Sequence, residues 1–424
     1  MSWGDKFFQI SLNQWNHFFR VRKSTLLQFI LVPKDKLCIG LVFSGFLLAM
    51  LGSLNPWFLW SINTKFPLLA SMLILPAIFI ARSRCKDDIF TRKDLFIAFL
   101  IFFIYEFYLQ IVNDKNINAY IVGVFNYPIV YALFKLDRRF YAPFMTVACK
   151  CMALMMCVSI PCFVLHLVGF SFPGHRAVFG DYFYIFTNYY FFMVDDRFVW
   201  DLIPRFSSVF LEPGHLGTAT VMLLLTQMGK WKKWYNLVLW VTTLMTFSLA
   251  AYVYAVVLLV LNSWVHRRKI FVKLIMVVVV VVSAGVGSFY YNNGDNMLHN
   301  LIVLRLEVDD AGKIAGDNRV TESFKREFDS FMTSSDIWFG REMPKSEFGN
   351  SGYRVFIYEN GMCALFLVVM LYLFVYRGTQ DKRAVFSAMS IVILAFVVRG
   401  YPLWYSNFIP CMLAGYNVFK GDWM

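Results

Sequence analysis

Long apolar runs separated by short polar segments fill this chain between Leu37 and Phe419. A helix needs about 20 apolar residues to cross a membrane, and soluble domains rarely hold such runs. The pattern therefore predicts an all-α, polytopic membrane protein with about twelve transmembrane helices. The expected runs are 37–54, 66–81, 95–112, 119–134, 144–169, 206–228, 235–247, 249–265, 274–290, 353–375, 384–398 and 403–419.

Two helix breaks are predicted from charge and length. The stretch 235–265 is uncharged, and basic residues flank it on both sides. One helix of that length would be about 46 Å long, whereas the hydrocarbon core is about 30 Å thick. Two helices with a break near Phe247–Ser248 fit better, because both flanks then lie in the cytoplasm. The same reasoning predicts a break at Arg399–Pro402, where Gly400 and Pro402 interrupt the helix.

The net charge of +13 orients the chain and does not indicate nucleic-acid binding. Lys and Arg cluster in short segments between apolar runs, as the positive-inside rule requires of cytoplasmic loops. The clusters are 82–93, 135–139, 230–233, 267–273 and 377–383. Both termini are therefore expected in the cytoplasm.

The expected organisation is one transmembrane domain, 37–419, between two cytoplasmic ends, 1–36 and 420–424. Residues 1–36 are either an amphipathic segment on the membrane surface or a loosely ordered tail. Two outer loops, 170–205 and 291–352, are much longer than the rest, and loops of that length are usually functional. The active face is thus expected outside the cytoplasm.

Cofactor and metal motifs are missing from the sequence. The eight cysteines lie in apolar runs or in the basic 82–93 segment, and no CxxC pair occurs. No P-loop, Gly-rich phosphate fingerprint or HExxH is present either. We expect no cofactor, no metal and no nucleic-acid partner.

The strongest candidate site joins the first long loop to the run 206–228. Arg205 and Glu212 are seven residues apart, and His215 follows three later, so on a helix they share a face. Pro213 is suited to the first helical turn, with Glu212 at the positive end. Ionisable groups at that depth are costly and mark functional sites by default. The structural alternative is an Arg205–Glu212 ion pair with His215 bonded to a loop carbonyl.

A second set of candidates lies in and after the 291–352 loop. Arginines bind pyrophosphate bidentately, and this set contains Arg319, Arg341 and Arg354, with Tyr353 beside the last. The alternative is a solvated loop with scattered charges. Arg399 is a further candidate, against simple snorkelling to the interface. Glu106 and Lys150 lie within apolar runs; they either line a cavity or pair with each other.

At these residues the chain resembles the bacterial O-antigen polymerases (the Wzy family), and more distantly the O-antigen ligases. The resemblance covers the layout of spans and loops. Locally it rests on Arg205…Phe210-Leu211-Glu212-Pro213…Gly217 and on Ser351-Gly352-Tyr353…Tyr358-Glu359-Asn360-Gly361 before an apolar helix.

The resemblance implies a metal-independent glycosyltransferase with a GT-C type of fold. Such an enzyme moves a growing glycan from undecaprenyl pyrophosphate to the terminal sugar of a new lipid-linked repeat unit, beside a chain-length regulator protein. Arginines would neutralise the leaving pyrophosphate, with Arg205, Arg319, Arg341, Tyr353, Arg354 and Arg399 as the expected binding residues. Glu212 or His215 would accept the proton of the acceptor hydroxyl.

Two other functions stay open. The ligases carry a functional histidine in the large loop, where this chain has only His299, at its beginning. A flippase for lipid-linked oligosaccharides would also fit twelve spans. It would show short loops on both sides and a charged midplane cavity, whereas here the charges gather near the outer surface.

Overall fold

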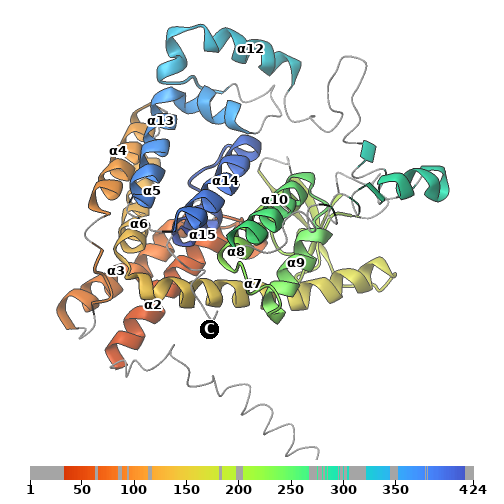
Figure 1. Cartoon of the computed structure of the whole chain (residues 1–424), viewed down its shortest axis with the longest axis horizontal. Coiled ribbons are helices and arrows are strands. Elements are labelled where there is room, and N and C mark those ends of the chain that lie inside the picture. Colours follow the sequence, from red (N-terminus) through yellow and green to blue (C-terminus); the bar gives the residue numbers. More distant parts are fainter. Residues whose placement is uncertain are drawn as a thin grey trace, which may run out of the picture.

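A computed structural model describes most of the chain as a bundle of helices (Figure 1). The described residues are 33–62, 65–84, 88–92, 95–112, 117–180, 184–196, 204–266, 321–343, 352–377, 379 and 381–415, with short pieces of 275–304. Among the predicted features, most of the 1–36 segment, the 420–424 tail, Arg319 and much of the 291–352 loop lie outside these residues.

The helices follow the apolar runs of the sequence. In chain order they are α2 (Pro33–Gly52), α3 (Phe66–Arg84), α4 (Phe96–Val112), α5 (Ile117–Val124), α6 (Asn126–Lys135), α7 (Tyr141–Leu167), α8 (Pro213–Thr226), α9 (Trp234–Met245), α10 (Leu249–Val265), α12 (Glu322–Met332), α13 (Tyr353–Tyr376), α14 (Lys382–Arg399) and α15 (Tyr405–Ala414). The α2 helix packs along α3, and α13 packs along α4. Figure 1 shows α7 running across the base of the bundle.

Two short helices, α8 and α15, form the centre of the bundle and pack against each other. All α15 residues are buried, and so is every α8 residue except Pro213 and His215. A helix that is apolar around its whole circumference is stable only inside other structure. The first turn of α8 is therefore held deep among the other helices.

Within the described residues, three helical stretches are long and apolar enough to cross a membrane: Asp35–Gly52, Arg138–Leu167 and Tyr353–Tyr376. Four more are apolar but shorter: Phe66–Arg82, Phe96–Val112, Tyr120–Lys135 and Leu249–Val265. The protein is thus mostly helical with the properties of a membrane protein. The run 119–134 differs from the prediction in one respect, since Phe125 separates α5 from α6.

Both predicted helix breaks are confirmed. The α9 helix ends at Met245 and α10 begins at Leu249, where the Ser248 hydroxyl caps α10 by accepting a hydrogen bond from the Ala251 N–H. The α14 helix ends at Arg399 because Gly400 takes a left-handed conformation, with φ of 69°. Glycine adopts this conformation without steric cost, which makes it the usual residue after a helix end.

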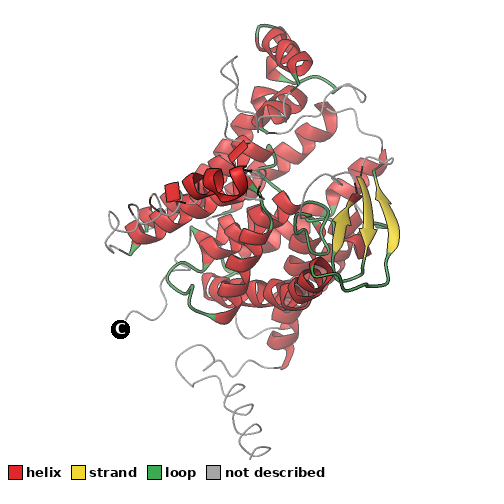
Figure 2. Cartoon of the chain, turned by 90° about the vertical axis from the view of Figure 1, so that its right-hand side faces the viewer, coloured by secondary structure: helices red, strands yellow, loops and turns green. Residues whose placement is uncertain are grey.

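The first long loop contains a small sheet that the sequence analysis did not predict. Strands β1 (His175–Phe179), β2 (Tyr184–Asn188) and β3 (Met193–Asp195) pair antiparallel in the order β1-β2-β3. Figure 2 shows the three strands beside the helical bundle. The sheet is tied to the loop before α8, because the Met193 N–H donates to the Ser208 carbonyl at 2.9 Å.

Residues 321–343 of the second long loop contain an amphipathic helix, α12, followed by a short 3-10 helix, η8 (Ser335–Trp338). Phe324, Phe328 and Phe331 of α12 are buried, and Phe331 lies against the Tyr358 ring of α13. Figure 1 shows α12 at the end of the bundle, beyond α13 and α4.

Candidate functional site

Two helix ends of opposite partial charge meet in the candidate site. Glu212 is the residue before α8, and Pro213 is its first residue, as predicted. Arg399 is the last residue of α14. A helix carries partial positive charge at its N-terminus and partial negative charge at its C-terminus, so both side chains are favourably placed.

Glu212 binds three side chains from three parts of the chain. Arg399 Nη1 donates to Glu212 Oε2 at 2.9 Å. His215 Nε2 lies 3.4 Å from the same oxygen, and the Tyr184 hydroxyl of β2 donates to Oε1. The unpredicted sheet thus supplies one of the partners of Glu212.

These contacts occupy both carboxylate oxygens of Glu212. Arg399 and His215 lie against Oε2, and Tyr184 donates to Oε1. A general base needs an oxygen within reach of the proton that it accepts. The arrangement favours Glu212 as the residue that holds the Arg399 guanidinium in place.

Gly214 makes room for the Arg399 guanidinium. A Cβ atom at position 214 would lie 1.6 Å from Arg399 Nη2 and 2.9 Å from its Cζ. The backbones at Gly352 and Gly400 also approach closely, since a Cβ at 400 would be 2.3 Å from the Gly352 carbonyl oxygen. Glycines therefore let α8, α13 and the end of α14 converge around one side chain.

Arg399 lines a cavity of about 800 Å³. This volume lies within the range of about 300–1,000 Å³ that is usual for small-molecule sites. The cavity extends between α13 and the α14–α15 segment on one side and α4, α5 and α6 on the other. Its ionisable lining residues include Lys65, Glu106, Glu359 and Arg399.

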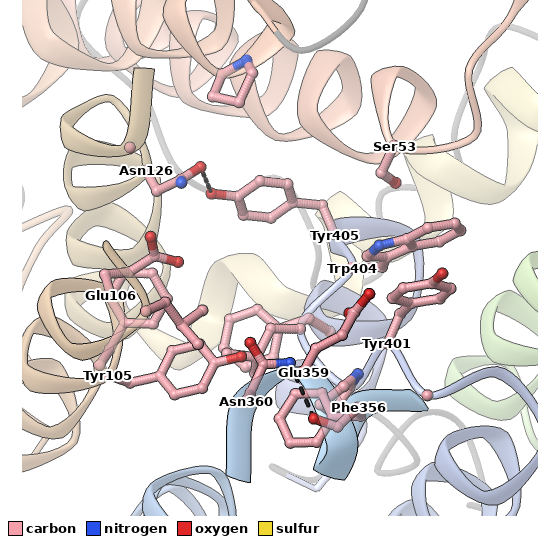
Figure 3. A pocket seen from close by; sticks show the side chains of 18 of the residues that line it. Ser53, Tyr105, Glu106, Asn126, Phe356, Glu359, Asn360, Tyr401, Trp404 and Tyr405 are labelled. Atoms are coloured by element: carbon pink, nitrogen blue, oxygen red, sulfur yellow. Dashed lines mark hydrogen bonds between the residues drawn. The ribbon is translucent and has the colours of Figure 1, made fainter. Parts of the chain in front are cut away.

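Aromatic rings form the wall beside Arg399. The Tyr401 and Trp404 rings stack with centroids 4.4 Å apart and an interplanar angle of 9°. The His215 ring meets Trp404 edge to face at 4.6 Å. Figure 3 shows Glu359 on the Tyr401–Trp404 side of the cavity and Glu106 on the opposite side.

Arg205 does not take the position beside Glu212 that was expected from the sequence. The segment before Pro213 is not helical, so the spacing of seven does not place Arg205 and Glu212 on one face. Arg205 Nε donates to the Thr246 carbonyl at 3.3 Å, at the break between α9 and α10. The ion-pair partner of Glu212 is Arg399, 187 residues away in the sequence.

Arg341, Tyr353 and Arg354 are also not among the residues that line the cavity. Arg341 binds two carboxylates, Glu327 at 2.9 Å and Asp336 at 2.6 Å. The Arg354 guanidinium lies over the Phe328 and Tyr353 rings, with centroid distances of 5.9 and 5.8 Å.

Glu106 and Lys150, the two candidates within apolar runs, lie in different parts of the bundle. Glu106 of α4 lines the cavity. Lys150 of α7 is exposed, and its ammonium lies 5.9 Å from the Tyr235 ring centroid. The interpretation of Glu106 as a cavity residue is therefore supported, whereas Lys150 lies in another part of the bundle.

Several site residues were not chosen from the sequence. Glu359 lies in the Glu359-Asn360-Gly361 motif, which contributed to the family resemblance but was not chosen as a site. Tyr401 and Trp404 follow the predicted break at Gly400, but only the fold shows that their rings stack. No sequence pattern marked Tyr184 as a site residue, because the strand that contains it was not predicted.

The site combines a fixed guanidinium, carboxylates and stacked aromatic rings around one cavity. Such a set suits a ligand that has an anionic group and a sugar-like body. Comparison of the chain with protein-family models, with curated proteins and with solved structures finds no match.

Proposed function

We propose that this protein polymerises undecaprenyl-pyrophosphate-linked repeat units of a surface polysaccharide. The proposal is carried by Arg399. Its side chain is only 11% exposed, it lines the cavity, and its buried Nε has no hydrogen-bond partner among the described residues. A buried donor without a partner is costly, so a ligand oxygen at that place would be bound favourably.

The leaving group is the anion that Arg399 would bind. The acceptor hydroxyl attacks the anomeric carbon of the growing glycan, and the bond from that carbon to the pyrophosphate oxygen breaks. Negative charge then grows on the pyrophosphate, where a preorganised guanidinium stabilises it. Lys65 also lines the cavity and adds a second cation.

Glu359 is the better candidate for the general base. It lines the cavity, whereas the oxygens of Glu212 bind Arg399, His215 and Tyr184. Glu359, Tyr401 and Arg399 line the same cavity. The acceptor proton would pass to Glu359, and Glu212 would position Arg399.

The membrane arrangement belongs to the same proposal. Twelve crossings with both termini in the cytoplasm would bring the cavity to the periplasmic face of the inner membrane. Lipid-linked glycans would be the substrates, and a chain-length regulator would be the protein partner. The apolar helices and the alternation of basic segments support this arrangement.

The proposal is tested by transfer with purified protein and lipid-linked repeat units. Arg399→Gln is expected to slow glycan transfer by about 10²–10³-fold, the usual effect of losing one charge-stabilising donor. Lys382→Gln is the matched control, because it removes an exposed cation from the other end of α14. The control is expected to retain the rate of the natural protein.

Three results would overturn the proposal. Absence of polymer from the natural protein would exclude polymerase activity. Equal rates for Arg399→Gln and the control would exclude a role for Arg399. Movement of intact lipid-linked units across vesicles, without any new glycosidic bond, would identify a flippase instead.

A further inference from the structure

The end of the cavity opposite Tyr401 and Trp404 contains polar groups that the proposed chemistry does not use. Glu106 and Gln110 of α4, Gly123 of α5 and Asn126 of α6 line this end. Figure 3 shows Glu106 and Asn126 on this side, with a hydrogen bond between the Asn126 side chain and the Tyr405 hydroxyl.

Gln110 is the most informative of these residues. It is 8% exposed, and its Oε1 atom is buried without a hydrogen-bond partner among the described residues. Gly123 leaves space for this amide, because a Cβ at position 123 would lie 2.9 Å from Gln110 Nε2. A buried carbonyl oxygen without a partner in a cavity wall favours a ligand that donates a hydrogen bond.

Glu106 adds a second acceptor at this end of the cavity. An ionised carboxylate only accepts hydrogen bonds, whereas the neighbouring Asn126 Oδ1 already accepts from Tyr405 at 2.7 Å. The pyrophosphate diester of a lipid-linked glycan offers no donors at neutral pH and would be repelled by Glu106. The sugar hydroxyl is the donor that fits, since two neighbouring hydroxyls can bind one carboxylate.

We propose that Glu106 and Gln110 form a subsite for the hydroxyl groups of an uncharged sugar in the glycan. The inference rests on the proposed function, because it takes the ligand to be a lipid-linked glycan whose pyrophosphate binds Arg399. The cavity is thereby polarised, with cationic recognition at Arg399 and hydroxyl recognition at Glu106 and Gln110. This polarity fixes the direction in which the glycan lies.

The test measures the binding of two separate probes to purified protein. One probe is the repeat-unit oligosaccharide released by mild acid from the host's own lipid carrier, and the other is inorganic pyrophosphate. Gln110→Met keeps the side-chain volume but removes the amide, and it is expected to weaken oligosaccharide binding about tenfold. Pyrophosphate affinity is expected to stay within about twofold, because Arg399 is unchanged.

Gly123→Ala tests the same subsite without touching a polar group. Its Cβ would displace the Gln110 amide, so oligosaccharide binding is expected to weaken. Gly40→Ala is the control, because a Cβ at that position meets nothing within 4 Å. Glu106→Gln should weaken binding as well, since it replaces an acceptor-only group.

The outcomes separate this inference from the proposed function. Oligosaccharide binding that is undetectable, or unchanged in Gln110→Met and Glu106→Gln, would overturn the subsite. An equal loss for both probes would show that Gln110 is structural and would overturn it too. Gln110-dependent binding by a protein without transfer activity would overturn the polymerase and leave the sugar subsite standing.

Discussion

Arg399 and Arg341 are both paired with carboxylates, but their surroundings differ. The Arg399 side chain is 11% exposed and bound to one carboxylate, Glu212, at the wall of a cavity. The Arg341 side chain is 29% exposed and lies between two carboxylates, Glu327 and Asp336, in the outer α12–η8 segment. From the sequence alone, both were candidates for binding pyrophosphate.

The two arginines differ in which of their N–H donors have a hydrogen-bond partner within the protein. Two carboxylates hold both Nε and Nη1 of Arg341, whereas Arg399 Nε has no partner among the described residues. Solvent screens an ion pair that is exposed, but a buried guanidinium keeps most of its field. Arg399 is therefore suited to a ligand, and Arg341 to holding α12 and η8 together.

The largest expected effect separates the two carboxylates near Arg399. Glu359→Gln should lower kcat by about 10²–10⁴-fold, because a positioned base contributes that much. Glu212→Gln should have a smaller effect on kcat and should raise KM for the lipid-linked donor, because Arg399 loses its ionised partner. Steady-state transfer kinetics with purified variants measures both quantities.

The reverse order would contradict the assignment. A large fall in kcat for Glu212→Gln, beside a mild one for Glu359→Gln, would return the role of base to Glu212, as the sequence first suggested. His215→Gln decides the remaining case. A large fall there, with mild effects at both glutamates, would make His215 the base.

A smaller effect is expected from Gly214→Ala. Helix propensity alone would favour alanine by up to about 1 kcal/mol, yet its Cβ would lie 1.6 Å from Arg399 Nη2. The guanidinium must move, and a misplacement of about 1 Å can cost up to about 100-fold in rate. We expect transfer to fall by about tenfold to 100-fold without loss of thermal stability.

Gly40→Ala again serves as the control, since its Cβ meets nothing within 4 Å. Transfer rates and melting temperatures of both variants are compared at equal protein levels. Full activity of Gly214→Ala would mean that the close approach of Arg399 to α8 is not needed for transfer.

The sequence predicted the local features of the fold well. The breaks at Ser248 and Gly400 followed from charge and backbone chemistry, and Pro213 began α8 as expected. These features depend on neighbouring residues, so their signals are short in range. In the part of the chain that the structure describes, three helices are long and apolar enough to span a membrane, while the count of twelve crossings stays a prediction.

The long-range pairs could not be predicted in the same way. Glu212 and Arg205 were expected on one face, because a helix was assumed between them, and an ion pair of the two was the structural alternative. The partner turned out to be Arg399, brought there by the packing of α8, α14 and α15. Tyr184 reaches Glu212 through a sheet whose short strands lack a clear alternation of polar and apolar residues.

The smallest effect is expected at the other arginine. Arg341→Gln leaves Glu327 and Asp336 without their common cation, in a segment where the pairs are largely exposed to solvent. Such pairs contribute little to stability, so the melting temperature should fall slightly and the transfer rate should stay within about twofold. Lys325→Gln, which removes an exposed charge from α12, is the control.

The pH dependence of that small fall identifies its cause. The hydrogen bond from Arg341 holds the pKa of Asp336 below its ordinary value. A carboxyl whose pKa is lowered by folding stabilises the protein above its unfolded pKa and loses that contribution as the pH falls. The difference in melting temperature between Arg341→Gln and the natural protein should thus be full at pH 7 and shrink below about pH 4. A loss of transfer as large as that of Arg399→Gln would instead mean that Arg341 contacts the substrate, and the distinction between the two arginines would fail.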